Sequence, residues 1–117
     1  MITVHPLSGE ATAKVGSETL TLVFDMAALI VAEQTDGRSF PELAADLLIA
    51  AQTKRLAKVG TMRALLFGAT RAHHPELTAD QCGALYLSHV DEIGTAVATV
   101  LIAALPKADR EDAPGEA

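Results

Sequence analysis

The sequence lacks several residues on which small functional proteins often depend. It has one cysteine, no tryptophan and only 3% aromatic residues. The single cysteine, Cys82, excludes an intrachain disulfide framework and a zinc site built on several thiolates, and it indicates a reducing compartment. No glycine-rich phosphate loop is present either, since neither G-x-G-x-x-G after a strand nor the Walker lysine motif occurs.

A basic excess is lacking too. Nine basic and 15 acidic residues give a net charge of −6, which disfavours sequence-blind binding of nucleic acid, because such binding depends on neutralising phosphates. The N-terminus lacks the basic start and apolar run of a signal peptide. The longest apolar run, residues 96–105, has about half the length of a membrane span. We therefore expect a cytoplasmic protein with no nucleic-acid or membrane partner.

Alanine and aliphatic residues are abundant instead. Half of the 117 residues are hydrophobic, and alanine occupies 22 positions. A chain of this length suits one domain with an ordinary core. Because alanine and leucine are the best helix formers, the composition favours short, closely packed helices.

The first part of the chain carries a β-sheet pattern. Leu20, Leu22 and Phe24 alternate with threonine and valine, a period of two that is typical of a half-buried strand. A weaker alternation precedes it, and the Gly16-Ser17 pair between the two runs suits a tight turn. We predict a β-hairpin over residues 10–24, with residues 2–4 available as a third strand.

From residue 25 onward the pattern is helical. Asp25, Ser39 and Thr78 stand at predicted helix N-termini, and the segments SFPE and TADQ read as capping boxes. Gly37 suits the left-handed position at the end of the first helix. A further helix is predicted from about Lys58 to His73.

Glycine and proline residues predict where the last three helices end. We expect Pro75 to stop the third helix, Gly94 to break the fourth, and Pro106 to end the fifth. The predicted fold class is α+β, an N-terminal β-hairpin followed by a bundle of about five short helices, in one domain over residues 1–106. Residues 107–117 are acidic without large apolar residues, and we predict a disordered tail there.

His73, His74 and Cys82 are the strongest candidates for chemistry. Imidazole and thiolate are zinc ligands, and a cysteine beside a histidine can act as a nucleophile. His89 follows Cys82 on the same predicted face, but two turns away, too far for both to reach one ion. The interpretation that we favour makes the histidines a helix terminus that complements the dipole and Cys82 a buried thiol. A small metal-binding or hydrolytic domain is the alternative.

The charges are unevenly distributed along the chain. Between Leu47 and Pro75 there are five basic residues and no acidic one, whereas the remaining four basic and 15 acidic residues leave a net charge of −11. The basic residues are Lys54, Arg55, Lys58, Arg63 and Arg71. For the individual residues we favour an ordinary solvated helix face. Their clustering keeps a second interpretation open, in which this surface docks an acidic partner with electrostatic steering.

The last predicted helix is apolar on nearly all sides. Val97, Val100, Leu101 and Leu105 belong to its apolar residues, and such a helix requires burial on several sides. Either it is central in the fold, or it forms a groove or a self-association surface. These four residues and the five basic ones are the candidate partner-binding residues.

Residues 62–78, MRALLFGATRAHHPELT, resemble a junction in the gene-transfer-agent tail proteins grouped with phage tail-assembly chaperones. The early hairpin, Glu33 in a short helix and the SFPEL segment fit the same pattern, so the resemblance runs from about residue 9 to residue 105. Its motifs are structural, a turn, a cap and a proline stop. The signature residues are Ser39, Glu42, His73, His74, Pro75 and Thr78.

The resemblance implies a non-enzymatic tail-assembly chaperone without a cofactor. Its partners would be the tail tape-measure protein, the tail-tube protein or both, and it would act in the cytoplasm of a bacterial host, with at most transient association with the particle. The alternative is a structural component that stays in the particle, such as a minor tail, tail-tube or connector protein. A tail-tube role suits this chain badly, because tube rings close largely through β-structure.

Overall fold

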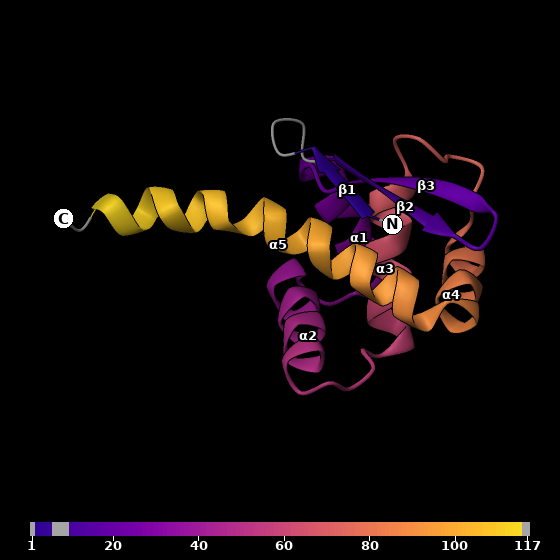
Figure 1. Ribbon diagram of the computed structural model, residues 1–117. Coiled ribbons are helices and arrows are strands. Elements are labelled where there is room, and N and C mark those ends of the chain that lie inside the picture. The colour runs from indigo at the N-terminus through magenta and orange to yellow at the C-terminus, as the bar shows by residue number, and fades with distance from the viewer. Residues whose placement is uncertain (1, 6–9, 116–117) are drawn as a thin grey trace.

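The computed structural model describes the backbone of residues 2–5 and 10–115 and the side chains of residues 10–103. Three strands are followed by five helices (Figure 1), so the fold is α+β as predicted. The elements are β1 (Ile2–His5), β2 (Glu10–Val15), β3 (Glu18–Val23), α1 (Met26–Asp36), α2 (Phe40–Gln52), α3 (Val59–Thr70), α4 (Ala79–Ser88) and α5 (Val90–Gly115).

The strands form one antiparallel sheet in the order β1-β2-β3. The predicted hairpin is confirmed: Gly16 adopts a φ of 64° in the turn, and Ala11 pairs with Leu22. On the inner face, Ala13 pairs with Leu20, and both side chains are buried. The hairpin therefore lays an apolar face onto the helices, with β2 against α5 and β3 against α3.

The predicted helix caps are present. The Asp25 side chain accepts a hydrogen bond from the Ala28 N–H, 2.8 Å away. Ser39 and Thr78 each form a capping box, with Glu42 and Gln81 respectively. Gly37 ends α1 at a φ of 91°, a conformation that glycine adopts without steric cost. These local signals determine where α1, α2 and α4 begin.

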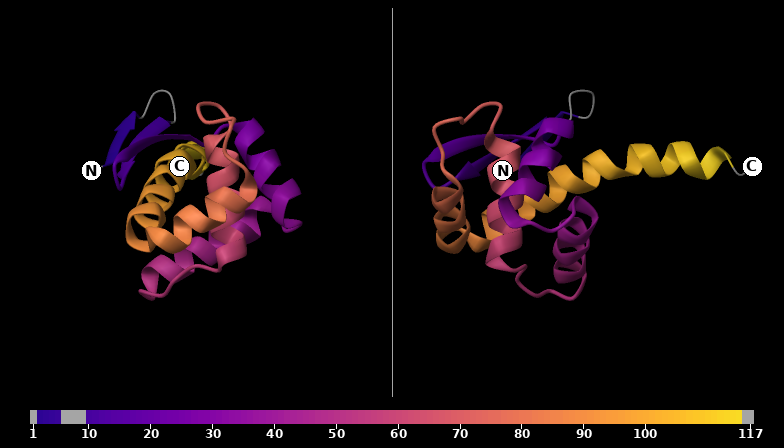
Figure 2. Two further views of the ribbon diagram at one scale, coloured as in Figure 1. Left: turned by 90° about the vertical axis from the view of Figure 1, so that its right-hand side faces the viewer. Right: turned by 180° about the vertical axis from the view of Figure 1, so that it is seen from behind.

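Helix α3 is the central element, in contact with α1, α2, α4, α5 and β3. It runs beside α1 (Figure 2), and Gly68 lies against the α1 backbone. A Cβ atom at Gly68 would overlap the Ala28 carbonyl oxygen and press on the Ala32 backbone. Small residues on both helices therefore allow this approach, and the alanines that are buried on these two helices are Ala28, Ala32, Ala64 and Ala69.

The predicted boundary between the last two helices is wrong. The chain turns sharply at His89, with φ −137° and ψ 56°, so that α4 ends at Ser88 and α5 begins at Val90. The predicted break at Gly94 falls inside α5, because a glycine weakens a helix by about 1 kcal/mol but does not forbid it. His89 ends α4 instead, with its N–H hydrogen-bonded to the carbonyls of Leu85 and Tyr86.

Helix α5 also continues past its predicted end. In the described backbone it passes through Pro106 to Gly115, so Pro106 does not end it. The disorder expected for residues 107–117 stays a prediction. Proline removes one helical hydrogen bond but has a φ compatible with a helix, so it can be accommodated. Residues 116–117 lie outside the described residues.

Candidate functional site

Cys82 lies in the core rather than in a reactive position. It is fully buried on α4, and its Sγ is 3.8 Å from Oγ1 of Thr70, itself buried on α3. Burial raises the pKa of the Cys82 thiol. Because the thiolate is the nucleophile and the metal ligand, this environment disfavours both roles.

The histidines each have a separate structural contact. Nε2 of His74 accepts a hydrogen bond of 2.9 Å from the Thr21 N–H, which ties the α3–α4 loop to β3. His73 lies 3.4 Å from a carboxylate oxygen of Glu10. We predicted both histidines at the end of this helix, and that prediction is wrong. Helix α3 ends at Thr70, so both residues lie in the loop that follows it.

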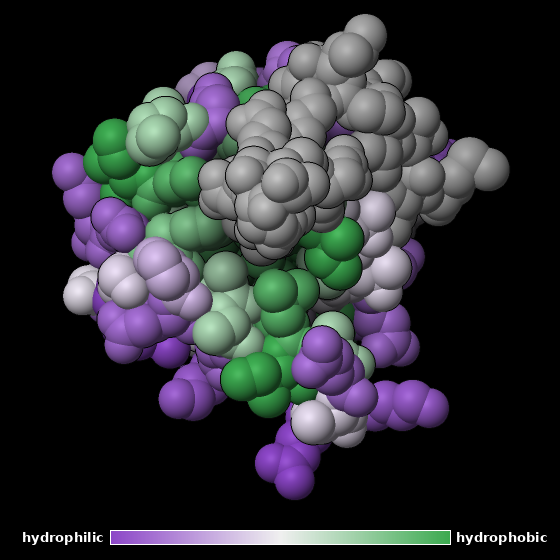
Figure 3. Space-filling view, turned by 90° about the vertical axis from the view of Figure 1, so that its left-hand side faces the viewer, coloured by the Kyte–Doolittle hydropathy of each residue, from purple (hydrophilic) through white to green (hydrophobic). Residues whose placement is uncertain are grey.

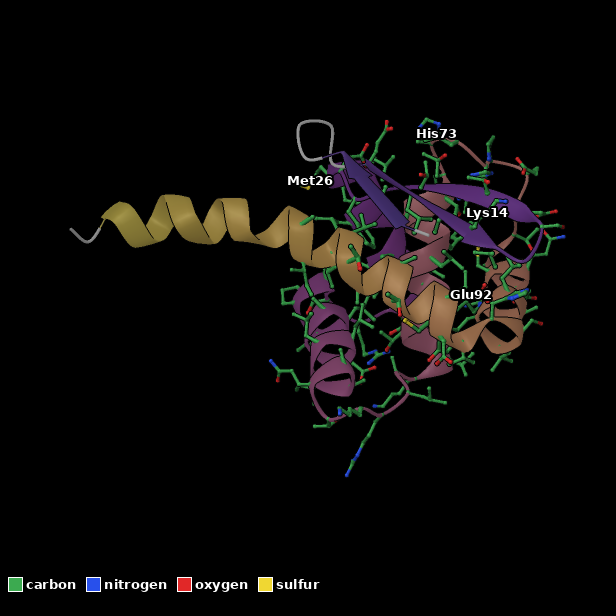
Figure 4. All side chains as sticks on the ribbon, viewed as in Figure 1. Lys14, Met26, His73 and Glu92 are labelled. Carbon is green, nitrogen blue, oxygen red and sulfur yellow. The ribbon has the colours of Figure 1, made fainter. Side chains whose placement is uncertain are left out.

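The structure does not bring the chemical candidates together. His89 is 3.1 Å from Glu92, which lies at the beginning of α5. His73 lies away from this pair, on the loop beside the sheet (Figure 4). Among the described residues, no hydrogen bond joins Cys82 to a histidine. Nor do any three His, Cys, Asp or Glu side chains there gather in a way that could hold a metal ion.

Arg71 is a structural residue rather than a candidate for docking. Its guanidinium donates hydrogen bonds to four backbone carbonyls around the α3–α4 loop and lies 3.8 Å from the centre of the Phe67 ring. These contacts hold the loop that contains His74 and Pro75. The donors of Arg71 are thus used within the fold, and we withdraw it from the predicted partner-binding surface.

The other four basic residues differ in what they contact. Arg63 pairs with Asp80 at 3.1 Å, an exposed pair. Lys54, Arg55 and Lys58 are exposed on the segment that joins α2 to α3. None of these three forms an ion pair with another residue in the described part of the chain. The predicted basic cluster is therefore reduced to a loop of three cations, which we call the basic loop.

The apolar candidates on α5 require a correction. Val97, Val100 and Leu101 are at most 2% exposed and belong to the core, so they do not form a docking surface. The helix is central on this face, in contact with β2, α4 and α2. The Leu105 side chain lies outside the described residues.

The opposite face of α5 borders an apolar groove. Gly94, Ala98 and Ile102 succeed one another at intervals of four residues along this face. Across from them lie the end of α2 and the α2–α3 loop, with Leu56 at the rim. The groove is open to solvent and has a volume of about 350 Å³. We call this feature the α2–α5 groove.

The groove has a buried floor and an exposed rim. Met62 and Tyr86 line it from below and are at most 3% exposed, whereas Leu56 is 69% and Ile102 50% exposed. Hydrophobic residues, drawn in green, gather on this side of the molecule (Figure 3). The rim thus exposes large apolar side chains that the core does not use.

Tyr86 fixes one wall of the groove. Its hydroxyl donates a 3.0 Å hydrogen bond to the Ala57 carbonyl oxygen, which anchors the α2–α3 loop to α4. Burial raises the pKa of the Tyr86 phenol, so the hydroxyl keeps its proton and remains a donor at neutral pH.

The groove was not predicted from the sequence, because the apolar residues considered there, Val97, Val100 and Leu101, lie on the buried face of α5. The spacing of Gly94, Ala98 and Ile102 was a usable signal, since residues four apart share one helix face. It became visible only with the helix beginning at Val90 rather than after Gly94. Leu56 carried no such signal, because it lies outside any regular element.

No known protein family, curated protein or solved structure matches this chain. Among the described helices, none alone is long and apolar enough to cross a membrane. The pair Ala79–Ser88 and Val90–Ala103, bent by 116°, meets that requirement together, by length and composition only.

Proposed function

We propose that the chain is a tail-assembly chaperone of a phage-like particle of the gene-transfer-agent type. It binds a tail protein, such as the tape-measure protein, during assembly and carries out no covalent chemistry. The proposal starts from the resemblance of residues 62–78 to that family. The observation that supports it best is the α2–α5 groove with its exposed apolar rim.

A groove of this kind is what a chaperone for an aggregation-prone partner needs. The domain has a core that is complete without Leu56 or Ile102, so their apolar surface is available to another protein. The net charge of −6 opposes self-association of a chain with such a surface. The domain can therefore remain folded both before and after it binds.

Co-expression tests this proposal. We expect the soluble yield of the tape-measure protein encoded beside this chain to rise several-fold when the two are produced together, and the two proteins to co-purify. The matched control is the same tape-measure protein produced with an unrelated acidic helical domain of similar size. If the tape-measure protein neither co-purifies nor gains solubility, the chaperone proposal is wrong.

Mass spectrometry of purified particles separates the proposal from a structural role. A chaperone is expected to be absent from mature particles or present far below one copy per tail. Recovery in fixed stoichiometry with the tail proteins would instead support a minor tail, tail-tube or connector component.

A further inference from the structure

We infer that the α2–α5 groove binds an amphipathic helix of the partner protein, with acidic residues along the flank of that helix that faces the basic loop. This inference deepens the proposed function and rests on it for the identity of the partner. The groove geometry and its charges determine what kind of segment fits.

The α5 wall is shaped for close approach by another helix. A Cβ atom at Gly94 would meet nothing within 4 Å, so the space beside this residue is empty. Ala98, one turn further, is only partly buried, and Ile102 projects at the rim. Residues four apart form one row of a helix surface, and a second helix packs along such rows when the side chains are small.

The charges give the groove two unlike sides. Arg55 lines the loop wall, and Lys54 and Lys58 are exposed nearby on the same segment. Asp91 is exposed on the α5 wall. A helix that presents carboxylates to the loop and a cation to Asp91 would be complementary to both sides. This arrangement selects one orientation of the partner helix and speeds its association.

Polar groups inside the groove are few. Apart from Tyr86, whose hydroxyl is bonded to Ala57, the polar side chains that line it within residues 10–103 are Arg55, Asp91, Thr95 and Thr99. Sites for small molecules enclose most of the ligand's surface, whereas a helix in a groove is held by apolar anchors at positions i, i+3 or i+4, and i+7 and keeps its other face in solvent. This groove is open, and large apolar side chains are exposed at its rim. The α2–α5 groove has the second character.

Peptide binding to the full chain tests this inference. The probes are three labelled synthetic peptides of about 18 residues, long enough for anchors over several turns. The first has a leucine stripe with glutamates along one flank, the second has lysines in place of the glutamates, and the third is a scrambled form of the first. Fluorescence anisotropy is expected to show at least tenfold tighter binding of the first peptide than of the others. High salt should reduce its advantage over the lysine peptide.

Variants of the chain locate the binding. Gly94→Leu fills the groove and should weaken binding of the glutamate peptide at least tenfold. Ala103→Leu adds the same side chain on an exposed position of α5 that does not line the groove, and should leave binding unchanged. If circular dichroism shows that Gly94→Leu is not folded, Ile102→Glu at the rim provides the same test. Replacing Lys54, Arg55 and Lys58 together by glutamate should reverse the preference between the two charged peptides.

With the peptides and the chain alone, any of three results would overturn the inference: equal binding of the glutamate and lysine peptides, unchanged binding by both groove variants, or a dimer in sedimentation that Gly94→Leu abolishes. The last would make a second copy of this chain the occupant. If the tape-measure protein co-purifies equally with Gly94→Leu, the groove inference fails and the chaperone function stands. If the peptides bind as expected but the tape-measure protein is unaffected, the groove stands and the proposed function fails.

Discussion

The α1–α3 contact and the α2–α5 groove use small residues in opposite ways. At the α1–α3 contact, Gly68 lies against the backbone of Ala28 and Ala32, and a Cβ atom there would overlap the Ala28 carbonyl oxygen. At the groove, Gly94 faces empty space. Both glycines lie within helices of one small domain. The difference lies entirely in what the fold places opposite each residue.

This comparison shows that an alanine- and glycine-rich composition has no single structural meaning. Where two helices of the same chain meet, small residues bring their backbones together and complete the core. Where no second helix is present, the same residues leave a depression bordered by exposed apolar side chains. We interpret the α2–α5 groove as a helix contact whose second helix comes from another protein.

The largest expected effect on stability is at the α1–α3 contact. Gly68→Ala forces α1 and α3 apart, because a backbone carbonyl cannot rotate away as a side chain can. We expect a loss of about 3 kcal/mol in the free energy of unfolding, measured by urea denaturation.

Gly83→Ala is the matched control for that substitution. Gly83 is also a buried glycine within a helix, but the nearest atoms to its Cβ would be those of the flexible Arg63 side chain, the closest at 3.6 Å. This variant should be as stable as the natural chain or slightly more stable. Similar losses for both variants would contradict the described α1–α3 contact.

Tyr86→Phe tests how the groove wall is held. The substitution removes the hydrogen bond to the Ala57 carbonyl oxygen and should cost about 1 kcal/mol of stability. Amide hydrogen exchange should become faster in residues 55–58. In α1 and α3, protection should fall only by the amount that the overall loss of stability explains. Unchanged exchange in the loop would mean that Tyr86 does not anchor it.

Gly94→Ala should stabilise the chain. The new methyl group enters empty space, and alanine favours a helix interior over glycine by about 0.8 kcal/mol. Thermal unfolding is therefore expected to shift upward, opposite to the result at Gly68. A lower melting temperature would show that the space beside Gly94 is filled in solution.

Leu56→Ala should have the smallest effect. Leu56 is 69% exposed at the rim, so its truncation is expected to change stability by less than about 0.5 kcal/mol. Leu47→Ala, in the same groove but buried, serves as the control and should lose about 3 kcal/mol. Comparable losses would place Leu56 in the core rather than at a docking rim.

Local signals in the sequence were sufficient to predict much of the fold. The alternation around Leu20 and Leu22, the turn at Gly16 and the caps at Asp25, Ser39 and Thr78 each depend on a few neighbouring residues. Whether the hairpin and the caps form is therefore decided mainly by residues that are close in the sequence. For this reason the hairpin and the beginnings of three helices could be predicted from the sequence.

The groove could not be predicted in the same way. Whether Gly94 breaks a helix or lies within one depends on the turn at His89 and on packing of α5 against the sheet. Likewise, the apolar residues of α5 divide into a buried face with Val97 and a rim with Ile102 only once the sheet is in place. The hydrogen bonds of Arg71 are local, to carbonyls three and six residues away, but they depend on the conformation of the α3–α4 loop, which the sequence did not predict.

Co-purification of the tape-measure protein with the Gly94→Leu and Ala103→Leu variants tests the central claim most directly. If the α2–α5 groove is the docking surface, Ala103→Leu retains the partner at the level of the natural chain and Gly94→Leu loses most of it, with both variants folded by circular dichroism. Equal recovery with the two variants would contradict the account, because a filled groove would then bind as well as an open one.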